Sequence, residues 1–95
     1  MSNNLFISYD LNSPHQDYDA TIEAIKNLGP WAYVQKSLWY VKTDLSSEEA
    51  AKRVREKQDS NDSLIVINTN NNEAHWYNIS DEVASQSKSI GISNA

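Results

Sequence analysis

One carboxylate in this chain of 95 residues has a position suited to chemistry, because the strand that carries it stops there. The stretch from Leu5 to Asp10 alternates with the strand period of two, and Asp10 falls on the face opposite the main apolar set. That set is Leu5, Ile7 and Tyr9. Turn-forming residues follow at 12–14, so we expect Asp10 at a rim that water or a metal ion can reach. Alternatively, Asp10 ends the strand and accepts backbone N–H bonds in that turn.

Other kinds of reactive site have less support in the composition. Cysteine is absent, which excludes thiol catalysis, a disulfide framework and thiolate metal sites. His15 and His75 have no second ligand at a metal-binding spacing. The only glycines are Gly29 and Gly91, too few for a glycine-rich phosphate loop. Asp10 is therefore the leading candidate for a reactive group.

The charge balance bears on the kind of partner. With 13 acidic and 8 basic side chains the formal net charge is −5, which repels phosphate backbones. Nucleic-acid binding would need a local basic patch or a metal. The one basic cluster has glutamates interleaved, so ordinary ion pairs along a helix explain it best. Its members are Lys52, Arg53, Arg55 and Lys57. The sequence has no signal-peptide pattern and no apolar run of ~18 residues, so we expect a cytoplasmic protein that does not enter membranes.

The elements that must position Asp10 continue with a helix and a pair of strands. Apolar residues at helical spacing predict a helix over residues 17–28, ended by Gly29 and Pro30. The aromatic and β-branched stretch that follows is long for one strand. We therefore expect two strands, Trp31–Gln35 and Leu38–Thr43, that meet at a tight hairpin, or else one bent strand.

The second half of the chain predicts a helix and a central strand. Ser46 and Glu49 match a capping box, so we expect a helix from Ser46 to about Gln58. Its apolar stripe is thin and consists of small residues, which requires close packing on the sheet. An unbroken apolar run in residues 63–69 indicates a strand that is covered on both faces or lies at the sheet centre.

The remaining residues predict short elements. Residues 74–79 fit a short edge strand, and Ser80 begins the capped start of a short final helix. We place one domain over residues 1–84, since a chain of this size buries roughly 60–65% of its unfolded surface. The tail of residues 85–95 is either disordered or a strand on another sheet, for example that of a partner chain.

This order of elements predicts an α/β (α+β) sandwich, the ferredoxin-like βαββαβ arrangement with a short C-terminal extension. Its helices cover one face of the sheet, and the other face needs a cover as well. That face would carry Phe6, one face of Trp39 or Tyr40, and half of residues 64–67. A second copy of the chain is the simplest cover, so we expect a homodimer through the sheets.

Three pieces of the sequence carry a resemblance to a known family. They are Tyr9-Asp10-Leu11 after an apolar strand, the segment Gln35-Lys36-Ser37-Leu38-Trp39, and Asn-Asp-Ser-Leu-Ile-Val-Ile at residues 61–67. In this order and spacing the chain resembles the small CRISPR-associated Cas-two family and its stand-alone SinR-like relatives, a superfamily that includes VapD-type toxins. The resemblance spans residue 5 to about residue 77.

The resemblance implies a ferredoxin-like homodimer. For active members it implies Mg²⁺-dependent cleavage of RNA or DNA, with the strand-end aspartate of both subunits as the catalytic metal ligand, here Asp10. Ser37 in the catalytic site and the Gln35 amide would orient phosphate oxygens, Lys36 would add positive charge, and Trp39 would stack on a base. Cleaving members carry an arginine two positions before the glutamine, where this chain has Tyr33.

Structural interpretations stand beside these roles. Gln35 and Ser37 can satisfy backbone groups at the strand bend, and Trp39 can be a core or dimer-interface anchor. The acidic net charge and the tyrosine in place of that arginine count against both nuclease activity and duplex binding. We therefore expect first a small homodimeric protein with a structural or binding role linked to nucleic acid, defence or a toxin module, for which a protein partner in a defence or counter-defence system is one candidate. The alternatives are a Mg²⁺-dependent endonuclease that cleaves RNA or DNA and a non-catalytic subunit of a CRISPR adaptation complex that holds duplex DNA.

Overall fold

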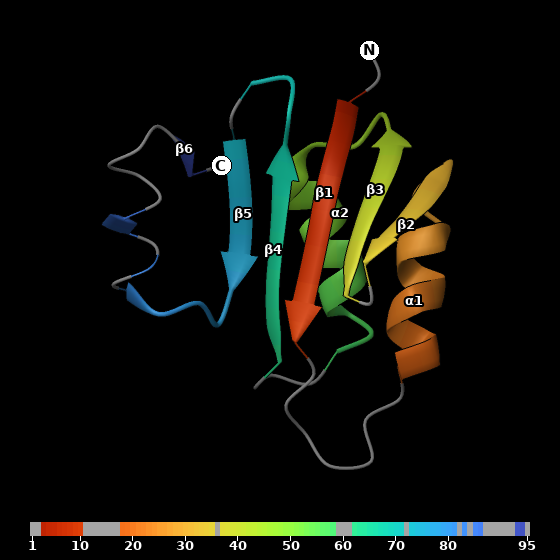
Figure 1. Cartoon of the computed structure of the whole chain (residues 1–95), viewed down its shortest axis with the longest axis horizontal. Coiled ribbons are helices and arrows are strands. Elements are labelled where there is room, and N and C mark those ends of the chain that lie inside the picture. The colour runs from red at the N-terminus through yellow and green to blue at the C-terminus, as the bar shows by residue number, and fades with distance from the viewer. Residues whose placement is uncertain are drawn as a thin grey trace.

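The computed structural model describes residues 3–10, 18–35, 37–58, 62–71, 73–81, 83, 85, 86, 93 and 94. In this part of the chain a six-stranded sheet forms, and helices α1 and α2 lie against one of its faces (Figure 1). The elements in chain order are β1 (Asn3–Asp10), α1 (Tyr18–Lys26), β2 (Trp31–Gln35), β3 (Leu38–Thr43), α2 (Ser47–Arg55), β4 (Ser63–Asn68), β5 (Glu73–Tyr77) and β6 (Ser93–Asn94).

Two crossover connections interlock in this sheet. Strand β3 lies between β1 and β2, and β1 lies between β3 and β4, each antiparallel to its neighbours. Each of α1 and α2 therefore links two strands that are separated by one inserted strand, which is the split βαβ arrangement. The predicted ferredoxin-like α/β sandwich is confirmed. The full order β2-β3-β1-β4-β5-β6 departs from a four-stranded sheet because β5 and β6 extend it beyond β4.

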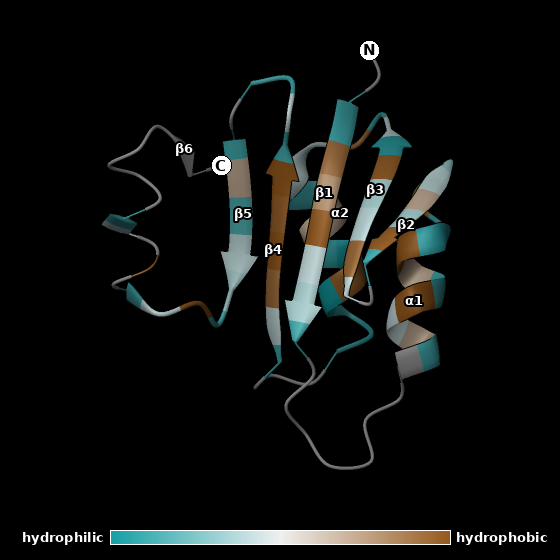
Figure 2. Cartoon of the chain, in the orientation of Figure 1, coloured by the Kyte–Doolittle hydropathy of each residue, from teal (hydrophilic) through white to brown (hydrophobic). Residues whose placement is uncertain are grey.

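The hydrophobic core lies between the sheet and helices α1 and α2. The alternation predicted for β1 is present, since Leu5 and Ile7 are 0% exposed and Tyr9 is 3% exposed. The other core side chains come from neighbouring strands and from the helices: Ile25, Trp39, Val41, Ala50, Ala51, Val54, Leu64 and Val66. Strand β4, in the interior of the sheet, is coloured hydrophobic along most of its length in Figure 2.

Helix α2 begins where the capping box predicted it. The Glu49 N–H donates to Ser46 Oγ at 3.1 Å, and the Ser46 N–H donates to Glu49 Oε1 at 3.3 Å. Two orphan backbone donors are thus satisfied at the helix start. Ala50 and Ala51 are completely buried. Their small side chains let the helix axis lie close to the sheet, as the thin apolar stripe required.

The C-terminal strands differ from the expectation in two respects. The sequence predicts a tail that is disordered or forms a strand on another sheet, but Ser93 and Asn94 pair within this sheet. Strand β5 is not an edge strand, because β6 pairs with it in parallel, Ser93 opposite Glu73 and Asn94 opposite Ala74. The residues between 86 and 93, which include Ile90 and Ile92, lie outside the described residues. The Ser80 hydroxyl accepts a hydrogen bond from the Val83 N–H at 3.3 Å, which agrees with its predicted capping role. Among the described residues, no helix combines the length and the apolar character needed to cross a membrane.

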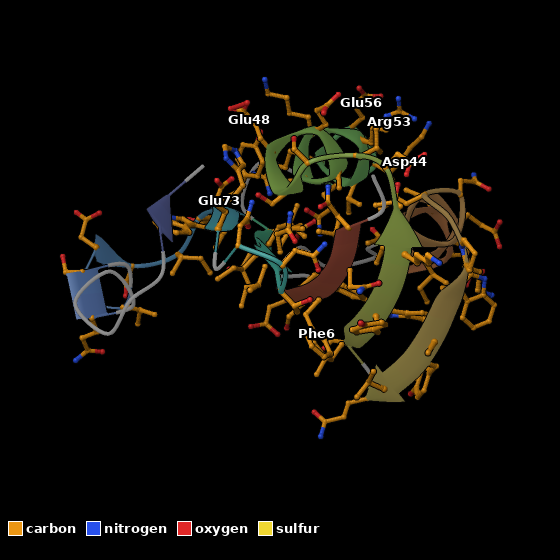
Figure 3. All side chains as sticks on the ribbon, turned by 90° about the horizontal axis from the view of Figure 1, so that it is seen from above. Phe6, Asp44, Glu48, Arg53, Glu56 and Glu73 are labelled. Atoms are coloured by element: carbon orange, nitrogen blue, oxygen red, sulfur yellow. The ribbon has the colours of Figure 1, made fainter. Side chains whose placement is uncertain are left out.

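The face of the sheet away from the helices carries an apolar surface, which we call the open face. Strand alternation and register place six large side chains on it: Phe6, Leu38, Tyr40, Ile65, Ile67 and Trp76. The Phe6 and Tyr40 rings meet edge to face with centroids 4.8 Å apart. Figure 3 shows Phe6 directed away from the helix layer. Strand β4 is therefore at the sheet centre, as one alternative predicted, but no helix or strand in the described part of the chain covers its open face.

Candidate functional site

Asp10 ends the central strand of the sheet. It lies opposite Ser63 at the last position of the β1–β4 ladder, and its side chain is exposed. Alternation along β1 puts Asp10 on the same face as Phe6 and Ser8, which is the open face. The predicted rim position of this carboxylate is thus present, at one end of the apolar surface.

Ser37 and Gln35 lie at the same end of the sheet as Asp10. The Ser37 carbonyl accepts a hydrogen bond from the Tyr9 N–H at 3.2 Å, which places Ser37 beside Tyr9 on the β3 side of β1. Gln35 is exposed and pairs with Leu38 across a register shift at the end of β2. Because Ser37 is level with Tyr9 and not with Asp10, the ladder assigns the Ser37 and Asp10 side chains to opposite faces. Lys36, the predicted source of positive charge, lies outside the described residues.

Trp39 occupies the core, not a surface. It is 3% exposed, and the rings of Trp31 and Tyr33 pack against it edge to face with centroid distances of 5.3 and 5.2 Å. A base stacks on an open ring face, and Trp39 has none that solvent reaches. Its placement is that of a core anchor, the interpretation that the sequence offers beside base stacking. Trp39 is therefore not placed to bind nucleic acid.

A contact that the sequence does not predict fixes the backbone next to this end of the sheet. Arg55 Nη1 donates to the Asp62 carbonyl oxygen at 2.7 Å, and the guanidinium carbon lies 5.0 Å from the centre of the Tyr77 ring. Asp62 is completely buried and immediately precedes Ser63, the residue opposite Asp10. Arg55 thus ties the end of α2 to the start of β4 and to β5. Its sequence signal was weak, because it looked like one more member of a basic helix face.

A metal site at Asp10 would need ligands from outside one copy of the chain. The described residues contain no group of three or more histidine, cysteine, aspartate or glutamate side chains placed to hold a metal ion. Mg²⁺, however, accepts one or two carboxylates and keeps several waters. One Asp10 carboxylate from each of two copies would fit that chemistry, so an assembly that brings two copies of Asp10 together would supply a donor set that suits Mg²⁺.

A cleft lies at the other end of the sheet. It has a volume of about 460 Å³, and Gly29, Lys42, Asp44 and Arg53 are among its lining residues. Because Thr43 pairs with Asn3 at the start of β1, this cleft is remote from Asp10 at the end of the same strand. Figure 3 shows Asp44 and Arg53 on the helix side of the sheet, opposite Phe6. The cleft therefore takes no part in the Asp10 site.

No protein-family model, curated protein or solved structure matches this chain.

Proposed function

We propose that this protein works as a homodimer, closed through the open face of the sheet, in a structural or binding role linked to nucleic acid. The observation that supports this most strongly is the open face itself. Phe6 and Tyr40 form a ring pair at its centre, with Ile67 directly opposite Phe6 on the next strand. A cluster of large apolar side chains on a sheet face that no helix covers is typical of an interaction site.

A second copy suits this surface better than a charged partner does. None of the six apolar side chains that define the open face is charged, and the described charged residues on the same face, Lys42 and Asp10, lie near its two ends. Two copies related by a two-fold axis can therefore meet there without opposing like charges at the centre of contact. The resemblance of the sequence to the Cas-two family, whose members are ferredoxin-like homodimers, supports the same assembly.

Mg²⁺-dependent cleavage of RNA or DNA is the second candidate function. It is favoured by the position of Asp10, which is exposed on the same face as the proposed dimer contact. In a two-fold assembly the carboxylates of both copies would supply the protein oxygens for one ion. A bound Mg²⁺ supplies polarisation of a phosphoryl oxygen and a lower pKa for its water. The task of this chain would be to hold that ion and to orient the phosphate through Gln35, which pairs with Leu38 of the open face. The Ser37 side chain lies on the other face of the sheet, so the role that the sequence predicted for it does not fit this arrangement.

The dimer is tested by a charge placed on the open face. We expect Phe6→Asp to convert the dimer into a monomer, because two unpaired carboxylates would have to be buried at the contact, at a cost of several kcal/mol. Sedimentation velocity gives the mass, and far-UV circular dichroism checks the fold. Asn27→Asp adds the same charge on an exposed residue after α1, away from the open face, and should leave the mass unchanged. A wild-type protein that is monomeric at high concentration would contradict the proposed assembly.

The nuclease candidate is tested at Asp10. If the wild-type protein cleaves labelled RNA or DNA with Mg²⁺, we expect Asp10→Asn to lower the rate by roughly 100-fold or more and EDTA to abolish it, because the metal loses its anionic ligand. Asp44→Asn removes an exposed carboxylate at the opposite end of the sheet and should cleave normally. Cleavage that persists in Asp10→Asn would exclude this mechanism. If the protein binds nucleic acid but does not cleave it, the result would support the binding role and not the nuclease.

A further inference from the structure

The edge strand β2 is unusually exposed for an apolar segment. Its five residues, Trp-Ala-Tyr-Val-Gln, are all exposed, and none is charged. Trp31, Tyr33 and Val34 have 46%, 58% and 46% of their surface accessible. Strand β2 ends the order of strands, so its outer edge has no neighbour among the described residues. Edge strands in natural proteins usually carry lysine, proline or a cover that prevents pairing with another chain, and β2 itself has neither residue.

The hydrogen-bond pattern shows which backbone groups face outward. The Lys42 N–H donates to the Pro30 carbonyl at 2.9 Å, so this pair is a hydrogen-bonded position of the antiparallel ladder. Hydrogen-bonded and non-hydrogen-bonded pairs alternate along such a ladder. The pairs one and three positions further along, Trp31 with Val41 and Tyr33 with Trp39, are therefore non-hydrogen-bonded positions. The N–H and C=O groups of Trp31 and Tyr33 consequently point away from β3, toward the open edge.

We propose that β2 pairs with β2 of a second copy of this chain, antiparallel around Ala32, so that the sheet continues from one copy into the next. In this register Trp31 of each copy lies opposite Tyr33 of the other, and every outward backbone group of these residues finds a partner. A register centred on Trp31 would place Trp31 opposite its own counterpart, and a register centred on Tyr33 would do the same for Tyr33. In neither register would Trp31 lie opposite Tyr33. The outer edge of β2 can therefore pair with the same edge of a second copy about a two-fold axis at Ala32.

The side chains suit this pairing. Trp31 and Tyr33 project on the helix side of the sheet, where they flank Trp39, and Lys26 Nζ lies 4.7 Å from the centre of the Trp31 ring. Pairing places Trp31 beside Tyr33 of the second copy, an aromatic cross-strand contact that removes both from water. Ala32 meets Ala32 on the opposite face, where the small side chains leave room. The register shift between Tyr33 and Gln35 lies beyond the paired segment.

This contact is separate from the open face and does not depend on the proposed function. It uses a sheet edge, whereas the proposed dimer uses the face that bears Phe6. Two different two-fold contacts on one chain join dimers into larger assemblies. The edge contact can therefore be disproved without disproving the open-face dimer, and the reverse also holds. The experiment tests the edge contact with the open face disrupted.

Disulfide linkage tests the edge contact directly, because the chain contains no cysteine of its own. Residues opposite each other at a non-hydrogen-bonded position have Cα atoms about 4.5 Å apart, within the range that a disulfide spans. We expect Ala32→Cys to form a linked dimer under mild oxidation at least tenfold faster than Glu56→Cys, an exposed position on α2. The same linkage should persist when Phe6→Asp is added, since that change affects only the open face.

A pair of changes at Tyr33 tests the role of the backbone. Added to Ala32→Cys, Tyr33→Pro removes an outward N–H without breaking a β3 hydrogen bond, so linkage should fall to the rate of Glu56→Cys. Tyr33→Val removes the ring but keeps the N–H, and it should retain most of the linkage. Far-UV circular dichroism verifies that both variants fold. Linkage of Ala32→Cys no faster than that of Glu56→Cys, or equal linkage with proline and valine at position 33, would overturn the proposal.

Discussion

Gly29→Ala should lower the free energy of unfolding by about 3 kcal/mol or more, a large fraction of the stability of a domain of this size. Gly29 has a φ of +156°, a conformation that side chains with a Cβ rarely adopt, and an added Cβ would collide with the Lys42 carbonyl oxygen. Neither the unfavourable φ nor the collision with the Lys42 carbonyl oxygen can be relieved by a small movement. The adjacent Pro30 carbonyl is held by the Lys42 N–H at 2.9 Å, so a shift of the turn would break the start of the β2–β3 ladder.

Urea denaturation followed by tryptophan fluorescence measures this effect. The matched control is Asn27→Ala, two positions earlier in the same turn, where φ is not positive and the side chain is exposed. That change should alter the unfolding free energy by no more than about 0.5 kcal/mol. If Gly29→Ala proved as stable as Asn27→Ala, the turn would have to adopt a different path, and the β2–β3 register described here would be wrong.

Local patterns predicted the elements that lie around Asp10. The bounds of β2 and β3 agree with the expected strands, and the Ser46–Glu49 capping box is present with both of its hydrogen bonds. These features depend on residues close together in the chain, where spacing and turn chemistry suffice. The same is true of Asp10, whose place at the end of β1 followed from the alternation of Leu5, Ile7 and Tyr9.

Features that depend on strand order were not available from local pattern. An apolar run does not reveal that Ile65 and Ile67 face outward while Leu64 and Val66 are buried, because that depends on which face the helices cover. Strand β6 has two residues and no period to detect. The three aromatic residues Trp31, Tyr33 and Trp39 look alike in composition, yet β3 is an inner strand and β2 an edge strand.

The candidate site also contains both residues that local pattern predicts and contacts that depend on the fold. Asp10 could be named from sequence, but the contact of Arg55 with the Asp62 carbonyl joins the last residue of α2 to the residue before β4, and no spacing rule anticipates it. The outward direction of the Trp31 and Tyr33 backbone groups required the observed hydrogen bond at Pro30. The position of the candidate carboxylate therefore follows from local pattern, while the surfaces that would bring copies together depend on the sheet topology.

Ile7→Ala should cost about 2–5 kcal/mol of unfolding free energy, because it leaves a cavity in the centre of the core. Ile7 is 0% exposed and lies between Trp39 of β3 and Val66 of β4 on the helix side. A domain of this size has a total stability of roughly 5–10 kcal/mol, so the loss is a large fraction of it. Thermal unfolding measures the effect, and the stability lost should not depend on protein concentration.

Phe6→Ala is the control one residue away, on the opposite face of the same strand. Phe6 is only half-buried in one copy, so its truncation should cost less than that of Ile7 at low protein concentration. If the open face is a dimer contact, the wild type gains stability from association as concentration rises, and Phe6→Ala loses that gain. Melting temperatures at concentrations roughly a hundredfold apart separate the two cases. If the melting temperatures of the wild type and Phe6→Ala depended equally on concentration, Phe6 would lie outside the contact. If Ile7→Ala lost less stability than Phe6→Ala at low concentration, the two faces of β1 would have been assigned the wrong way round.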